Sequence, residues 1–136
     1  MKIILAIMLL TNILVGATIK WHHNYNLARY QAKKEHKNIL LFITEKNNPF
    51  CEGMVEDMFI EEDIIDAVNK DYLAVMIDIN EHILPTGLGP LYSPSLYFLT
   101  NRGKNIIRRV VGETTPREMR RYLKKVRKTQ KIIILK

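Results

Sequence analysis

Residues 38–59 constrain this chain more than any other segment, because they predict a buried strand, a sharp loop and a helix in direct succession. Five of the six residues 39–44 are apolar and three are β-branched, which is typical of a central strand covered on both faces. The polar residues 46–48 end this run. Asn48 is a favoured N-cap, and Pro49 suits the first helical position because it has no N–H to leave unpaired. Apolar residues at helical spacing follow: Met54, Met58 and Phe59.

The only cysteine, Cys51, falls in the first turn of that expected helix. Unpaired N–H groups and the positive end of the helix dipole stabilise a thiolate there, so a partly exposed cysteine at this position reacts at neutral pH. The neighbouring carboxylate of Glu52 opposes this effect. Cys51 is therefore the candidate catalytic residue.

Two more helices and one more strand are predicted on either side of this segment. Helix-forming residues over 27–37 follow Asn26, a plausible N-cap. Residues 60–69 have helical apolar spacing and an acidic first turn, so they continue or restart the helix of Cys51. Residues 72–79 are apolar and β-branched, which favours a second buried strand.

The C-terminal third predicts a hairpin and a last helix. Residues 95–100 and 106–111 read as two strands joined by a turn at Gly103. Thr114 or Thr115 then caps a helix with Pro116 at its first position. Together the elements predict one α/β domain with a central mixed β-sheet flanked by helices.

The strand, the loop and the residues Asn-Pro-Phe-Cys-Glu-Gly-Met resemble the active-site segment of the thioredoxin superfamily, closest to periplasmic thioredoxin-like proteins with a Trp-Cys-x-x-Cys-Lys-x-Met pattern. On that pattern Cys51 matches the second cysteine and Met54 the methionine, while Asn48 stands where the first, attacking cysteine belongs. Glu52 replaces a basic residue, and Phe42 stands where thioredoxin has a buried acid. The resemblance implies a thioredoxin fold with a degenerate catalytic site.

Ser93 and Pro94 directly precede the strand predicted over residues 95–100. In the thioredoxin superfamily the matching proline is cis and faces the active-site cysteine, and the backbone of the residue before it pairs with bound polypeptide. The resemblance therefore implies that Ser93 and Pro94 form the wall opposite Cys51, and that the substrate-binding groove also includes Asn48, Pro49 and Phe50. A trans proline that merely ends a loop is the alternative.

Residues 80–92 contain two prolines and two glycines, a composition that disfavours the regular helix that thioredoxins place here. We expect a loop with at most a short helical turn, and we expect it to shape the rim of the groove beside Cys51.

The N-terminus predicts export. Lys2, an apolar stretch over residues 3–15 and the small residues Gly16 and Ala17 are typical of a secretory signal peptide. We expect a signal over residues 1–17 and a single thioredoxin-like domain over residues 18–136, located in the periplasm; an uncleaved membrane anchor is the alternative. A lone cysteine in an exported protein indicates a free thiol, an intermolecular partner or a buried inert group.

The charge is concentrated at the C-terminal end. Residues 102–136 hold 13 basic and two acidic residues, a net charge of +11, against +7 for the whole chain. The basic face of the last helix indicates either a solvated surface or contact with an anionic membrane surface or an acidic partner. Nucleic acid is a poor candidate because no base-stacking aromatic residues lie beside the basic ones.

Residues 132–135 form an apolar tail that we expect to pack on the domain or on a partner.

Two functions fit these patterns. The first is thiol–disulfide exchange or redox homeostasis through Cys51, with protein thiols as partners, although one cysteine cannot resolve its own mixed disulfide. The second is a non-catalytic module that binds an extended peptide or partner protein at the groove. No cofactor is predicted, and the spacing of His22 and His23 to the other histidines does not suggest a metal site.

Overall fold

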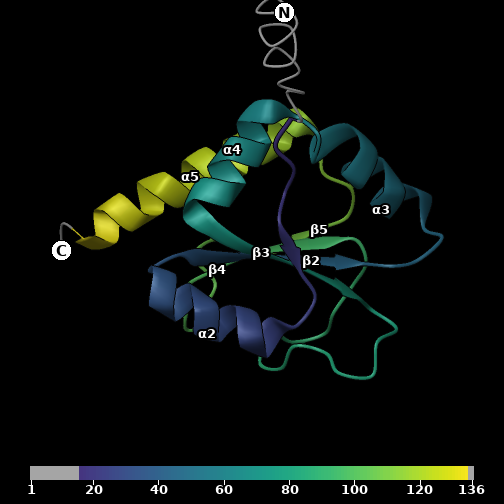
Figure 1. Cartoon of the computed structure of the whole chain (residues 1–136), viewed down its shortest axis with the longest axis horizontal. Coiled ribbons are helices and arrows are strands. Elements are labelled where there is room, and N and C mark those ends of the chain that lie inside the picture. The colour runs from purple at the N-terminus through teal and green to yellow at the C-terminus, as the bar shows by residue number, and fades with distance from the viewer. Residues whose placement is uncertain (1–15, 135–136) are drawn as a thin grey trace, which may run out of the picture.

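A five-stranded mixed β-sheet forms the centre of the computed structural model, which describes residues 16–134 (Figure 1). The strands lie in the order β1-β3-β2-β4-β5. Their bounds are Trp21–His22 (β1), Asn38–Thr44 (β2), Tyr72–Asp78 (β3), Ser95–Leu99 (β4) and Val110–Val111 (β5). The helices are Tyr25–Glu35 (α2), Pro49–Gly53 (α3), the π-helix Met54–Met58 (η1), Glu62–Asp71 (α4) and Pro116–Ile134 (α5). This confirms the predicted fold class.

β2 occupies the middle of the sheet, as its apolar sequence predicts. It pairs in parallel with β3, from Asn38 opposite Tyr72 to Thr44 opposite Asp78. On its other side it pairs antiparallel with β4, so that Ile43 lies opposite Ser95. The carboxyl end of β2 therefore meets the amino end of β4, and the segment containing Cys51 begins beside Ser93 and Pro94.

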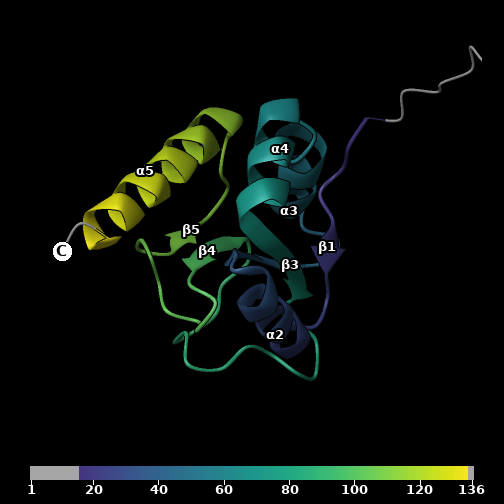
Figure 2. The same cartoon turned by 60° about the vertical axis from the view of Figure 1, so that its left-hand side comes forward.

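Helices cover both faces of the sheet (Figure 2). α2 packs on one face, where Ala28 and Ala32 meet Ile39 and Leu41 of β2. The other face carries α3, η1, α4 and α5, and their buried side chains join the alternate residues of β2 and β4. Each buried Leu, Ile, Phe or Met contributes about 1.5–3 kcal/mol to folding. None of the helices within residues 16–134 combines the length and apolar character that crossing a bilayer requires.

The N-cap of α2 is Asn24, so the prediction of Asn26 was wrong. Asn24 has an extended backbone, and its side chain accepts a hydrogen bond from the backbone N–H of Leu27 at 3.0 Å. Tyr25 already belongs to the helix because its ring is buried in the core beside Ala28. This packing begins the helix two residues earlier than local propensity indicates. α2 ends at Glu35, and His36 follows in the left-handed conformation.

The return strand of the hairpin is shorter than predicted. After the pair Leu99–Asn105, the Ile106 N–H still donates to the Phe98 carbonyl at 2.8 Å. Residues 107–109 then bulge out of the ladder before Val110 pairs with Leu96. The bulge lets the guanidinium of Arg109 donate to the Pro90 carbonyl and, at 3.1 Å, to the Tyr97 hydroxyl. Only Val110–Val111 forms β5.

α5 begins with a capping box. The Thr115 hydroxyl accepts from the Glu118 N–H at 3.2 Å, and the Glu118 carboxylate accepts from the Thr115 N–H at 3.0 Å. Met119, Leu123 and Val126 are buried, as their spacing predicts. The expected tail is the end of this helix through Ile134, while residue 135 and the expected signal up to residue 15 lie outside the described residues.

Candidate functional site

The first side of the candidate site is the helix wall, residues 48–51. Asn48 has an extended backbone (φ −94°, ψ 114°) and its side-chain oxygen accepts from the N–H groups of Phe50 and Cys51 at 2.9 and 3.4 Å. Pro49 occupies the first helical position. These observations confirm the predicted cap and the first-turn position of Cys51. They also show that the Asn48 side chain is bonded within its own helix.

Cys51 is a buried free cysteine with an exposed fraction of 2%. Its side chain belongs to the core cluster that includes Met54, Met58 and Phe59. On its outer side it lines a hollow of about 410 Å³ whose other lining residues include four acids: Glu45, Glu52, Glu56 and Asp78. A thiol in this setting has little access to a partner, and the carboxylates repel an anionic one.

Behind the helix wall, Phe42 lies in an aromatic cluster. Its ring centroid is 6.0 Å from that of Trp21 and 5.4 Å from that of Phe59, and the last two rings meet edge to face at 4.9 Å. Phe42 is fully buried. The surroundings of Phe42 are therefore apolar, and β2 supplies no carboxylate behind Cys51.

The second side of the site is the loop wall, Ser93 and Pro94, which are joined by a cis peptide bond, the geometry that the resemblance implies. The Ser93 hydroxyl donates to the Glu45 carboxylate at 2.6 Å. The Pro94 carbonyl accepts from the Gly112 N–H at 2.8 Å. Within residues 16–134, neither the N–H nor the carbonyl of Ser93 has a hydrogen-bond partner. Ser93 thus offers free backbone groups beside the helix wall.

The structure brings the two walls together through residues that sequence reasoning missed. Glu45 links them because the register of β2 and β4 sets it opposite Ser93. Glu113 borders the helix wall, since a Cβ on Gly53 would lie 3.5 Å from its carboxylate. The hollow lined by Cys51 does not include Ser93 or Pro94 among its lining residues. No local signal marked Glu45, because its role depends on strand pairing.

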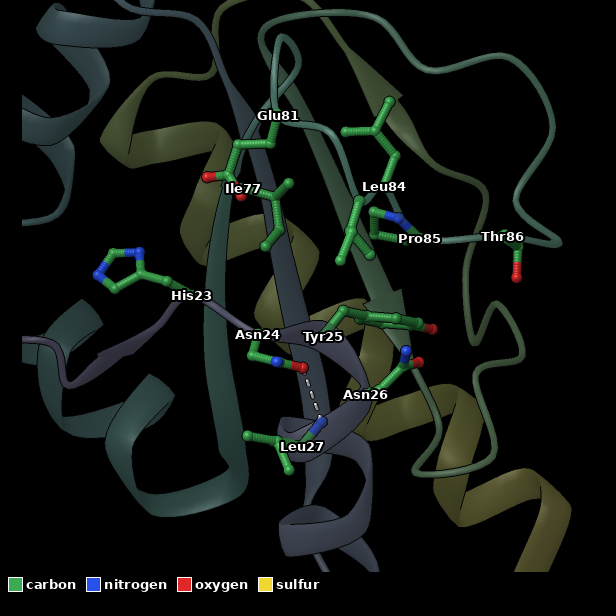
Figure 3. A pocket seen from close by; sticks show the side chains of 11 residues that line it. His23, Asn24, Tyr25, Asn26, Leu27, Ile77, Glu81, Leu84, Pro85 and Thr86 are labelled. Atoms are coloured by element: carbon green, nitrogen blue, oxygen red, sulfur yellow. Dashed lines mark hydrogen bonds between the residues drawn. The ribbon is translucent and has the colours of Figure 1, made fainter.

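The loop that follows β3 lies elsewhere than expected. As predicted, residues 79–94 contain no helix or strand. However, Glu81 and residues 83–86 line a cavity of about 470 Å³ against the start of α2, shared with Tyr25 and Leu27 (Figure 3). They do not line the hollow beside Cys51. Burial raises the pKa of Tyr25 in this cavity, and the nearby Arg29 cation partly offsets the rise.

His23 lies at the edge of the sheet, where its ring contacts a backbone carbonyl. Nδ1 of His23 lies 3.1 Å from the Met76 carbonyl of β3, at the edge where β1 pairs with that strand. Within the described residues, His, Cys, Asp and Glu side chains form no group of three or more suited to a metal ion.

A comparison with known families matches residues 25–127 to the thioredoxin-like domain. The match covers more than half of the chain, so the chain belongs to the thioredoxin-like family. No curated protein sequence matches the chain significantly.

Solved structures show the same fold at low identity. DsbH oxidoreductase is 20% identical, with 89% of this chain and 90% of that chain covered and a TM-score of 0.64. A thioredoxin from Thermus thermophilus is 14% identical, with 81% and 88% covered and a TM-score of 0.66. The oxidised C-terminal domain of DsbD from Neisseria meningitidis is 15% identical, with 83% and 99% covered and a TM-score of 0.60. These matches show the shared fold; one of the matched structures is named an oxidoreductase, whereas this chain has a single cysteine.

Proposed function

We propose that this chain is a thioredoxin-like module that binds an extended polypeptide segment between its helix wall and its loop wall, without thiol chemistry. One contrast carries the proposal. The side chain in the attacking position, Asn48, is bonded to the backbone of α3, and the neighbouring thiol of Cys51 is buried. The backbone N–H and carbonyl of Ser93 are free of partners within residues 16–134.

Binding would use backbone pairing, in which an extended segment adds to the unpartnered backbone groups of the half-buried Ser93 as one strand adds to another. Pro94, fixed by the Gly112 hydrogen bond, would support the segment. Phe50 has an exposed fraction of 58% and would provide an apolar contact, with Asn48 and Pro49 beside it. Backbone pairing gives such a site broad tolerance for the side chains of its partner.

The proposal is tested with an unfolded polypeptide that cannot engage a thiol, namely reduced and fully carboxymethylated α-lactalbumin. Binding is followed by fluorescence anisotropy. Phe50→Ser is expected to weaken binding about fivefold or more, the loss typical of an apolar contact at an interface. Leu27→Ser is the matched control, because Leu27 is also exposed (67%) but lies on α2, across the sheet.

Cys51→Ala separates the two functions in the same assay. It is expected to bind the carboxymethylated polypeptide as tightly as the wild type does. Absence of binding by the wild type, or equal losses in Phe50→Ser and Leu27→Ser, contradicts the proposed groove.

Thiol exchange through Cys51 is the second candidate, favoured by the hollow that this side chain lines. The Cys51 thiolate would attack a partner disulfide, form a new S–S bond and release the partner's other sulfur as a thiolate. An external thiol would then have to free Cys51, since no second cysteine exists in the chain. The surrounding carboxylates favour neutral or cationic partners over anionic thiols.

Insulin disulfide reduction in the presence of dithiothreitol distinguishes the candidates. The binding function predicts equal, background rates for the wild type and Cys51→Ala. Asn48→Cys serves as the positive control, because it places two cysteines three residues apart at the start of α3, and we expect turnover from it. Wild-type turnover that disappears in Cys51→Ala would instead establish the thiol function.

We also propose that the chain is exported to the periplasm and cleaved after Ala17, on the strength of the basic, apolar and small residues at its start. The intact mass of the protein from the cell envelope tests this. A chain that begins at Thr18 is expected; a full-length chain in the membrane fraction would support the anchor instead.

A further inference from the structure

The outward side of α5 carries a continuous basic stripe that ends in an exposed apolar residue. Arg117, Arg121, Lys125 and Lys128 follow one another at intervals of three or four residues, so they share one side of the helix, and all four are exposed. Ile132 comes four residues later on the same side, with an exposed fraction of 57%. We call these five residues the basic stripe.

Packing fixes the direction of the basic stripe. Met119, Leu123 and Val126 are buried on the opposite side of α5 and hold that side against the sheet and its neighbouring helices. The stripe therefore faces away from the core. In both overall views the C-terminal end of α5 extends past the sheet (Figures 1 and 2).

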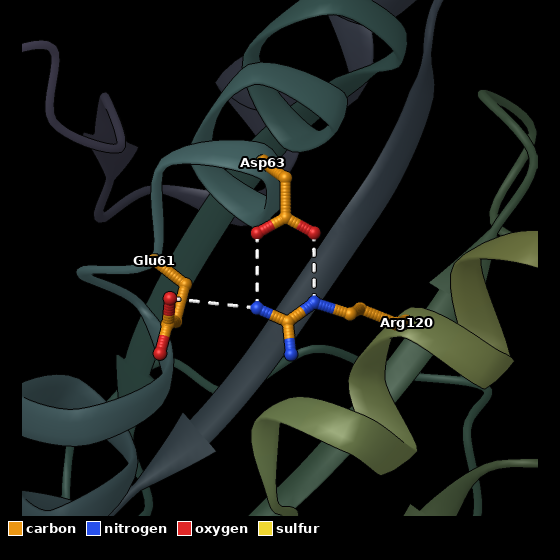
Figure 4. A network of polar contacts seen from close by, with 3 residues as sticks. All are labelled: Glu61, Asp63 and Arg120. Atoms are coloured by element: carbon orange, nitrogen blue, oxygen red, sulfur yellow. Dashed lines mark hydrogen bonds and ion pairs between the residues drawn. The ribbon is translucent and has the colours of Figure 1, made fainter.

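The charges of the stripe are not neutralised within the domain. Arg120, on a different side of α5, pairs with Asp63 at 2.7 Å and with Glu61 at 3.4 Å (Figure 4). It is the only residue of α5 that forms an ion pair within residues 16–134. Four like charges thus lie along one exposed side of a helix, an arrangement that repels itself unless an anionic surface covers it.

We propose that α5 lies along the surface of an anionic lipid bilayer, with the four basic residues of the stripe on the headgroups and Ile132 in the headgroup layer. Juxtaposed basic residues each strengthen binding to such a surface about fivefold. The exposed Ile132 at the projecting end of the stripe favours a bilayer over a nucleic acid or an acidic polypeptide, because only the bilayer offers an apolar interior. The binding groove would then work close to the membrane.

The test measures binding of the full chain to vesicles by flotation at low salt. One set contains phosphatidylcholine with about 30% phosphatidylserine, a typical anionic leaflet charge, and the other contains phosphatidylcholine alone. The variant Arg121→Gln/Lys125→Gln/Lys128→Gln removes three stripe charges. Lys33→Gln/Lys34→Gln/Lys104→Gln is the matched control, because it removes three exposed charges on α2 and in the β4–β5 turn. The apolar N-terminal segment is common to all variants, so only their differences are interpreted.

The stripe variant is expected to lose about a hundredfold in affinity for the anionic vesicles, while the control changes less than about threefold. Hydrogen exchange of residues 121–134 should slow with anionic vesicles and remain unchanged with neutral ones. Ile132→Ser should weaken binding several-fold in a salt-independent manner. Equal losses in both triple variants, or unchanged exchange in α5, would overturn the proposal. So would polyglutamate binding as tight as vesicle binding and insensitive to Ile132→Ser, which would indicate an acidic protein partner.

Discussion

The helix wall and the loop wall differ in how their polar groups are satisfied. In the helix wall, Asn48 accepts hydrogen bonds from two backbone N–H groups, and Cys51 packs into the core. The side chains of Asn48 and Cys51 therefore have their partners within the domain. In the loop wall, Ser93 uses only its hydroxyl within the domain, bonded to Glu45, and its backbone is free of partners within residues 16–134.

The two walls thus differ in one respect: the polar groups at the start of α3 are satisfied within the domain, whereas the backbone groups of Ser93 are not. Asparagine stabilises the start of a helix better than most residues, so Asn48 at the N-cap of α3 favours a wall optimised for stability. Unpaired backbone groups, by contrast, cost free energy unless water or a ligand satisfies them. A bound partner that forms hydrogen bonds therefore gains more binding free energy at the loop wall than at the helix wall.

Truncating the side chain behind the helix wall should have the largest effect. Phe42→Ala is expected to lower the free energy of unfolding by about 3–5 kcal/mol, because it leaves a cavity between the rings of Trp21 and Phe59. Urea denaturation followed by circular dichroism measures it. The control Phe50→Ala, on the exposed part of the wall, should stay within about 0.5 kcal/mol. Similar losses in the two variants would mean that the aromatic cluster does not support the helix wall.

Tyr72, at the start of β3, touches neither wall. A stability change at this residue serves as a reference for changes within the walls. Burial, followed by the charge of Asp71, raises the pKa of Tyr72 above its ordinary value of 10.0. Folding thus favours the neutral phenol, and its contribution is fully present below pH 10 and lost as the pH rises further. The loss amounts to at most about 1.4 kcal/mol per pH unit. The urea midpoint is measured as a function of pH. In Tyr72→Phe its decrease above pH 10 should be smaller than in the wild type. An equal decrease in both proteins would show that folding does not raise the pKa of Tyr72.

Removing the cap tests whether the helix wall is built for stability. Asn48→Ala is expected to lower the free energy of unfolding by about 1 kcal/mol, since the N–H groups of Phe50 and Cys51 lose their acceptor. Asn48→Ser retains a capping oxygen and should lose much less. Binding of the carboxymethylated polypeptide should change little in either variant, which would separate the cap from the groove. Equal stability of the two variants would contradict the capping role.

The ion pair between α4 and α5 should have the smallest effect. The Arg120 hydrogen bond holds the pKa of Asp63 below its ordinary value of 3.8. The carboxylate therefore stabilises the fold above about pH 4, and this contribution is lost as the pH falls through the lowered pKa. Arg120→Gln should shift the urea midpoint slightly at pH 7 and low salt, progressively less as the pH falls below about 4, and hardly at all in 1 M salt. A shift that persists in acid would rule out the ion pair as its cause.

Much of the fold was predictable because its signals are local. The apolar run of β2, the cap at Asn48, Pro49 at the first helical position and the spacing of the last helix each depend on a few neighbouring residues. The structure places all of them as expected. The central place of β2 in the sheet was also expected from its apolar sequence.

The rest depends on packing between distant segments. The π-helix Met54–Met58, where the Phe59 N–H donates to the Met54 carbonyl, interrupts a pattern that predicted an ordinary helix. The burial of Cys51 and the hollow lined by acids arise from the meeting of β2, β3 and α3. Likewise, Glu45 faces Ser93 only because two strands pair in one register.

Backbone amide chemical shifts during titration with the carboxymethylated polypeptide test the central claim most directly. The account predicts saturable shifts at Phe50, Ser93 and Gly112 in the wild type, and the same shifts in Cys51→Ala. Shifts confined to other surfaces, or shifts at these residues that vanish in Cys51→Ala, would contradict a polypeptide-binding groove that works without its thiol.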